Sequence, residues 1–88
     1  MPPSKKWKDS SGRVWRVFGS AASLPPVPGV LAVLIECDDH VELLEEHHTS
    51  DLHRQARHRL DTAIFVFAAY CSARGGRLRW GVRLRRHR

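Results

Sequence analysis

The last third of the sequence lacks carboxylates. Six of the nine acidic residues lie between Glu36 and Glu46, and none follows Asp61. The stretch from Arg74 to Arg88 carries seven arginines and no acid. A catalytic or metal-binding carboxylate therefore cannot come from this end of the chain. Arginine is always charged and holds phosphate oxygens with a planar fork, so the same stretch predicts a phosphate-binding surface.

Cysteines and long apolar runs are also scarce. The two cysteines, Cys37 and Cys71, are too few for a disulfide scaffold, and their apolar surroundings favour buried free thiols. The longest apolar run, residues 63–71, is far shorter than the ~20 residues that span a bilayer. Residues 1–8 lack the apolar segment of a signal peptide. We expect a cytoplasmic protein with no membrane partner.

Length and charge narrow the class of protein further. The 88 residues form one domain at most, and such a chain buries roughly 60–65% of its unfolded surface. This size leaves no room for both a full core and a large substrate cavity. The formal charge of +6 and the pI near 10.4 favour a polyanionic partner, so we expect DNA or RNA. No phosphate-binding loop or dinucleotide motif is present, which argues against a nucleotide cofactor.

Local patterns predict an α+β fold with a small sheet of about three strands. Residues 1–12 are polar and favour a flexible basic arm. Residues 13–18 alternate as in a short strand or strand-like arm, and residues 29–36 form a continuous aliphatic run typical of a buried strand. A turn at residues 37–40 and a second strand over residues 41–45 would complete a β-hairpin.

A helix is expected after this hairpin. Thr49, Ser50 and Asp51 are all suitable N-caps. An aliphatic stripe with helical spacing follows them, formed by Leu52, Ala56, Leu60 and Ala63. We expect a third strand to begin near Ala63 or Ile64, because residues 64–67 are β-branched or aromatic. Residues 77–88 fit the periods of a strand and of a helix equally well.

The resulting domain plan has three parts: the arm over residues 1–12, a core over 13–73 and an Arg-rich segment over 74–88. Trp15 and Trp80 are expected in the core, whereas Trp7 is expected to be exposed. The predicted nucleic-acid contacts are the arginines of the helix and of the last segment. They are Arg54, Arg57, Arg74, Arg77, Arg79, Arg83, Arg85, Arg86 and Arg88.

Two short motifs resemble the GIY-YIG nuclease family over about residues 24–60. Pro28-Gly29-Val30 opens the first strand of the hairpin, and Thr49-Ser50-Asp51-Leu52 leads from the hairpin into the helix. The resemblance implies a GIY-YIG-like scaffold, a nucleic-acid substrate and a divalent metal such as Mg²⁺ for hydrolysis.

The positions that carry chemistry in that family depart from its pattern. The first family tyrosine falls on Leu31, the second on Glu45, the glycine on His47 and the helical arginine on Gln55. The family's metal-binding glutamate has no counterpart, because no acid follows Asp61. Hydrolysis of a phosphodiester needs an activated water, a metal and positive charge at the phosphate. The departures therefore predict a degenerate member that binds nucleic acid and has impaired catalysis.

The sequence is also compatible with two alternative functions. An active metal-dependent endonuclease would use Glu45 or Glu46 with His47 or His48 as metal ligands. An assembly protein would pair the acidic hairpin of one chain with the Arg-rich end of another. The sequence favours no zinc site, because Cys37 and His40 form the one short ligand pair and their possible partners, His47 and His48, lie across the predicted hairpin. It favours no catalytic triad either, since no G-x-S-x-G motif is present and Cys71 has no histidine near it in sequence. No cofactor or bound metal is expected in the preferred interpretation.

Overall fold

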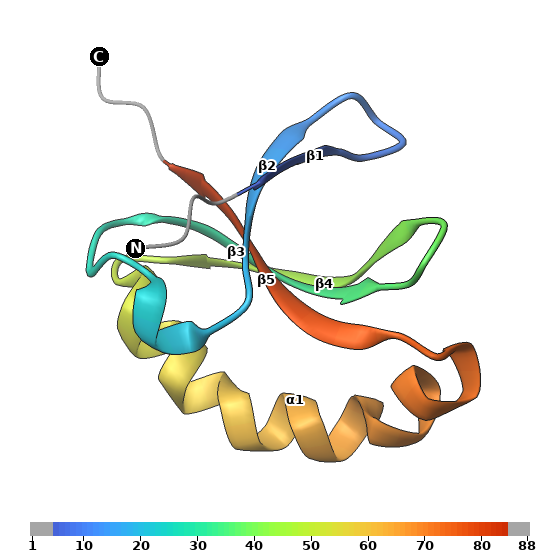
Figure 1. Cartoon of the computed structure of the whole chain (residues 1–88). Coiled ribbons are helices and arrows are strands. Elements are labelled where there is room, and N and C mark those ends of the chain that lie inside the picture. Colours follow the sequence, from blue (N-terminus) through green and yellow to red (C-terminus); the bar gives the residue numbers. More distant parts are fainter. Residues whose placement is uncertain (1–4, 85–88) are drawn as a thin grey trace.

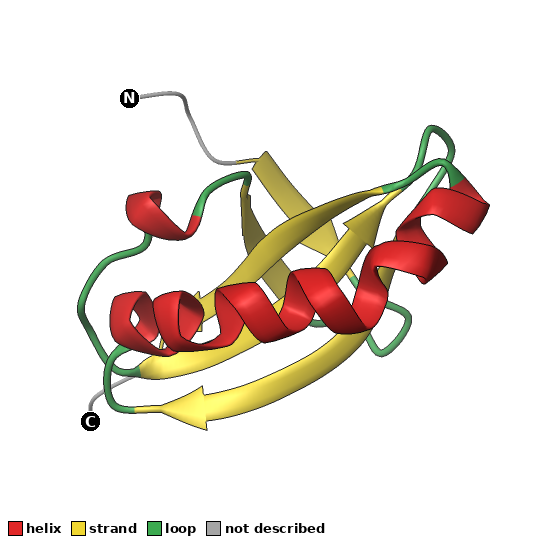
Figure 2. Cartoon of the chain, turned by 90° about the horizontal axis from the view of Figure 1, so that it is seen from below, coloured by secondary structure: helices red, strands yellow, loops and turns green. Residues whose placement is uncertain are grey.

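The computed structural model describes residues 5–84 and has an α+β architecture (Figure 1). Within these residues, five strands form one antiparallel sheet in the order β1-β2-β5-β3-β4. One α-helix, α1, covers one face of that sheet (Figure 2). The elements in chain order are β1 (Lys5–Lys8), β2 (Val14–Phe18), the 3-10 helix η1 (Ala21–Ser23), β3 (Gly29–Glu36), β4 (Val41–Thr49), α1 (Leu52–Arg74) and β5 (Arg77–Leu84).

The sheet is larger than the expected three strands. β1 lies within the region expected to be a flexible arm, and its Trp7 pairs with Trp15 of β2. β5 lies between β2 and β3, near the middle of the sheet. The Arg-rich segment over residues 74–88 is therefore not separate from the core, because residues 77–84 pair with strands on both sides.

The helix continues through the stretch where a third strand was expected to begin, so that prediction was wrong. Ala63 is fully buried against the sheet, and Phe67, one helical turn later, packs on the same core. These contacts continue the stripe that starts at Leu52 and Ala56. Packing of this stripe therefore overrides the strand preference of the β-branched and aromatic residues between them.

Capping groups define both ends of α1. The side chain of Asp51 accepts a 3.0 Å hydrogen bond from the backbone N–H of Arg54, as an N-cap does. The N–H of Leu52 donates to the carbonyl oxygen of Val27 at 2.9 Å, which ties the proline-rich loop to the helix start. Gly75 ends the helix in the left-handed conformation, with φ of 63°.

Two hydrophobic clusters hold the fold together, one on each face of the sheet. The cluster under α1 is formed by Ala21, Leu24, Leu31, Val33, Leu52, Ala56, Ala63, Trp80 and Val82. The second cluster contains Trp15, Val17, Ala32 and Leu34 on the opposite face. Trp7 of β1 and Leu43 of β4 both pack against it, although their strands are the two edges of the sheet. The sheet is therefore strongly curled, and the expected core positions of Trp15 and Trp80 are confirmed.

Candidate nucleic-acid interface

The predicted arginine surface is divided among several parts of the molecule. Arg79 forms a 3.1 Å ion pair with Glu36, and Arg74 lies 3.6 Å from Glu42 while stacking on the ring of Tyr70. Arg77 is exposed at the start of β5. The remaining predicted contacts of the last segment, Arg85, Arg86 and Arg88, lie outside the described residues.

The two helical arginines lie on a different surface. Arg54 and Arg57 are exposed on the first turns of α1, where they line a shallow hollow with His53 and His58. Asp51 also lines this hollow, so its charge is mixed. The structure therefore does not join these two arginines and those of β5 into one patch.

A stronger concentration of positive charge lies between β2 and β5. The two strands pair only from Arg16 to Phe18, and beyond Arg16 they splay apart (Figure 1). The gap forms a hollow that we name the cationic groove. Its described lining residues are Lys6, Ser11, Gly12, Arg13, Val14, Arg16, Val82, Arg83 and Leu84. Four of them are cationic and none is a carboxylate.

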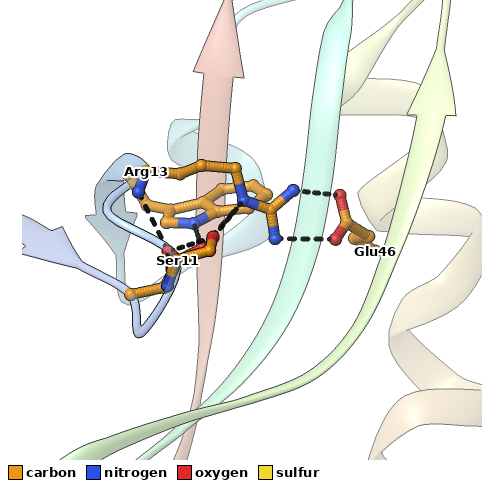
Figure 3. A network of polar contacts seen from close by, with 5 residues as sticks. Ser11, Arg13 and Glu46 are labelled. Carbon is orange, nitrogen blue, oxygen red and sulfur yellow. Dashed lines mark hydrogen bonds and ion pairs between the residues drawn. The ribbon is translucent and has the colours of Figure 1, made fainter.

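The guanidinium of Arg13 is fixed in place at one wall of this groove. Its two terminal nitrogens donate to the carboxylate of Glu46 at 3.1 and 3.0 Å, and its Nε donates to Asp9 at 3.0 Å (Figure 3). The hydrogen bonds that Arg13 donates to Glu46 are the main reason that the pKa of Arg13 is raised. Arg13 is therefore permanently charged and oriented, although part of its charge is already balanced.

The indole of Trp15 contacts two cations of the groove but is not accessible to a ligand. The guanidinium carbons of Arg13 and Arg83 lie 5.3 and 5.5 Å from the centre of its ring. The indole is fully buried, so it cannot stack on a base. Its role here is to position two cations through cation–π contacts.

Three of the four cations of the groove were not among the contacts predicted from the sequence. Lys6, Arg13 and Arg16 come from the first two strands and the turn between them, more than 60 residues before Arg83. The alternation of basic and aromatic residues around Trp7 and Trp15 was the sequence feature that could have indicated these cations. Only the pairing of β2 with β5 shows that these cations meet Arg83.

The candidate nuclease residues of β4 are separated by strand geometry. His47 pairs with Leu31 and lies toward α1, whereas His48 pairs with Val30 and lies on the other face. Glu45 lies 3.1 Å from His47, but both of its oxygens also accept hydrogen bonds from one helical side chain, Arg59, at 2.6 and 2.9 Å. These bonds, those from Arg59 first, lower the pKa of Glu45.

The other positions of the family pattern are equally unlike a nuclease centre. Leu31 is fully buried in the cluster under α1, so no hydroxyl could be exposed there. Gln55 is half-buried at the hollow on the helix start and lies apart from the cationic groove. Among residues 5–84, no group of three potential metal ligands comes together.

The four glutamates of the acidic hairpin are neutralised within the chain. Glu36 pairs with Lys5 and Arg79, and Glu42 accepts a 2.7 Å hydrogen bond from Tyr70 besides its contact with Arg74. Glu45 and Glu46 are bound by cations from α1 and from the β1–β2 hairpin, as described above. The charge complementarity seen in the sequence is therefore largely satisfied inside one molecule.

The cysteines are half-buried rather than fully buried. Cys37 and Cys71 are both free thiols, and desolvation raises the pKa of each of them. A raised pKa keeps a thiol protonated at neutral pH, which lowers its reactivity.

No helix in the described part of the chain is long and apolar enough to cross a membrane.

Comparison with known proteins identifies no relative for this α+β domain. No known protein family, curated protein or solved structure matches the chain.

Proposed function

We propose that this protein is a small basic domain that binds the sugar–phosphate backbone of nucleic acid in the cationic groove. The observation that carries the proposal is the meeting of Lys6, Arg13, Arg16 and Arg83 in one hollow whose described lining holds no carboxylate. A phosphate there would be held by guanidinium and ammonium groups at short range. Arg85, Arg86 and Arg88 follow Leu84 of the groove in sequence.

The groove favours recognition of phosphates over recognition of bases. Its described lining offers no aromatic ring, and its apolar members, Val14, Val82 and Leu84, are aliphatic. Binding is therefore expected to be independent of base sequence and to weaken steeply with salt, because it depends on release of counterions.

We also propose that β3, β4, α1 and β5 correspond to a degenerate GIY-YIG-like scaffold with impaired catalysis. Support comes from the order of hairpin, helix and returning strand, which follows the two matched motifs. Glycine at position 29 also has a structural reason, since a Cβ there would lie 2.6 Å from the carbonyl oxygen of Arg83. Impaired catalysis is supported by the burial of Leu31 and by the engagement of Glu45 with Arg59.

Fluorescence anisotropy with a labelled duplex and a labelled single strand tests the binding proposal. We expect the double substitution K6A/R16A to weaken binding at about 100 mM salt and to reduce the slope of log K against log salt by about 2, one for each lost phosphate contact. The matched control is R54A/R57A, which removes the same charge from the helix surface. Absence of binding by the wild type at low salt, or equal losses in both double variants, would overturn the proposal.

Catalysis is tested on the same complexes. Incubation with and without Mg²⁺, followed by a denaturing gel, should leave both strands intact. Cleavage that depends on Mg²⁺ and disappears in Glu45→Gln would contradict impaired catalysis and would support the endonuclease alternative.

A further inference from the structure

The two cysteines of the chain lie at the same end of the domain. Cys37 directly follows β3, and its backbone N–H donates to the carbonyl oxygen of His40 at 2.8 Å, so the turn after β3 fixes its position. Cys71 lies in the last turn of α1, four residues after Phe67, which packs on the cluster under the helix. Because residues four positions apart share one face of a helix, Cys71 is on the side of α1 that faces the sheet.

The end of the helix brings Cys37 next to Cys71. The N–H of Gly76 donates to the carbonyl oxygen of Cys71 at 2.9 Å. The N–H of Gly75 donates to that of Ser72 at 3.3 Å, and the two bonds form a Schellman motif. In this motif the side chain two residues beyond the helix commonly packs on the residue that accepts the first bond, here Cys71. Gly76 has no side chain, but a Cβ on it would lie 3.1 Å from the sulfur of Cys37. This sulfur therefore lies where a side chain at position 76 would contact Cys71.

Further contacts hold the two cysteines in this arrangement. Ile35, which is fully buried, fills the rest of the same space and closes this end of the core. The side chain of Tyr70 donates a 2.7 Å hydrogen bond to Glu42 of β4, so the last turns of the helix are fixed to the sheet. The negative charge of an ionised Cys37 contributes, after desolvation, to the raised pKa of Cys71, as expected for two thiols at short range.

We infer that Cys37 and Cys71 are a modification site at which a small disulfide such as oxidised glutathione forms a reversible intramolecular disulfide, joining the turn after β3 to the end of α1. Cys37 lines an open hollow at this end of the sheet, so an oxidant reaches it first. Its thiolate attacks one sulfur of the oxidant, releases one glutathione thiolate and forms a mixed disulfide. The thiolate of Cys71 then attacks the sulfur of Cys37 and releases the second glutathione. The two cysteines lose two electrons and two protons, which the two glutathione molecules gain.

The bond would stabilise the fold. It closes a loop of about 35 residues that contains β4 and most of α1, and such a loop restricts the unfolded chain. The two ends of the loop are already in place in the folded protein, so the bond requires little rearrangement. The melting temperature of the oxidised protein should therefore exceed that of the reduced protein by at least about 5 °C.

Oxidation of the folded full-length chain tests the inference. The protein is incubated with about 5 mM oxidised glutathione at pH 8.5, where more of each thiol is ionised, and the remaining thiols are then alkylated. We expect the wild type to stay monomeric, to lose the mass of two hydrogen atoms and to take up no alkylating agent. Dithiothreitol should restore both thiols and the lower melting temperature. The matched controls are Cys37→Ser and Cys71→Ser, in which oxidation should not raise the melting temperature.

Three results with the wild type alone would overturn the inference, so it does not depend on the folding of a variant. Two thiols that remain open to alkylation would show that the bond does not form. Glutathione bound to both cysteines, or cross-linked dimers on a non-reducing gel, would show that the thiols do not meet within one chain. An oxidised monomer that melts below the reduced protein would show that the bond distorts the fold. None of these measurements involves nucleic acid, so the proposed groove is tested separately.

Discussion

Arg13 and Glu46 lock the first hairpin of this protein to the far edge of its sheet. The two side chains are 33 residues apart in sequence and meet through a pair of parallel hydrogen bonds of 3.1 and 3.0 Å (Figure 3). Arg13 directly precedes β2, whereas Glu46 belongs to the edge strand β4. Their contact closes the curl of the sheet and at the same time places one cation at the groove.

This double role predicts opposite effects of Glu46→Gln on stability and on binding. The substitution removes an anion that balances Arg13, so we expect nucleic-acid affinity to rise by about two- to fivefold at 100 mM salt. The melting temperature should fall, because the charged pair is lost. Anisotropy and thermal unfolding on the same sample measure both quantities. Arg13→Gln should lower both, and unchanged affinity in Glu46→Gln would contradict the assignment of Arg13 to the groove.

Asp9 is expected to make the fold sensitive to acid. The indole N–H of Trp15 donates to this carboxylate at 2.9 Å, and this bond, with those from Ser11 and Arg13, lowers the pKa of Asp9 well below its ordinary value of 3.8. A lowered pKa in the folded state stabilises the fold above the unfolded value. That stability is lost as the pH falls through the folded value.

We therefore predict that the melting temperature falls steeply in acid because of Asp9. The melting temperature of the wild type should change little between pH 7 and pH 5 and should drop below about pH 4. Asp9→Asn should melt lower than the wild type at pH 7 and should show a shallower drop in acid. Equal slopes below pH 4 would mean that Asp9 contributes nothing to acid unfolding.

The contribution of His40 to the stability of the fold should have the opposite dependence on pH. Its ring nitrogens lie 2.6 Å from Asp39 and 2.9 Å from Glu42, and these hydrogen bonds raise its pKa above the ordinary 6.5. The stabilisation is fully present below pH 6.5 and is lost as the pH rises through the folded pKa. His40→Gln should therefore cost more stability at pH 5.5 than at pH 8.5. An NMR titration of the His40 ring, with a midpoint at or below 6.5, would contradict this prediction.

Trp15 should be the most important single side chain for stability. It is fully buried, and it fills the second cluster between Val17, Ala32 and Leu34. Trp15→Ala is expected to cost about 3–5 kcal/mol. A domain of this size has a total stability of roughly 4–13 kcal/mol, so the variant should lose a large fraction of it. Urea denaturation measures the loss, and Phe65→Gln, an exposed aromatic, serves as the control.

Close packing of the sheet also predicts a cost at Gly81. A Cβ at this position would lie 3.1 Å from Leu34, 3.2 Å from Ala32 and 3.3 Å from Trp15. Gly81→Ala therefore overfills the second cluster and should cost about 1–3 kcal/mol. The control is Gly19→Ala, where the added atom meets only the flexible guanidinium of Arg79 at 3.9 Å. A smaller loss at Gly81 than at Gly19 would contradict the packing argument.

Local patterns determined several parts of this protein. The aliphatic run of residues 29–36 specified a buried strand, and the turn after it specified a hairpin. The N-cap at Asp51 and the stripe that begins at Leu52 specified the start of the helix. Each of these features depends on neighbours within a few turns or residues, so the sequence carries the whole signal.

The tertiary structure decided the rest. Residues 64–67 prefer a strand locally, yet they are helical because Ala63 and Phe67 pack on the sheet. β5 fits two periods equally well, and only its pairing with β2 and β3 makes it a central strand. The cationic groove follows from that pairing and from the point where it ends. Long-range contacts of this kind arise from packing between distant segments, which the pattern of any one segment does not encode.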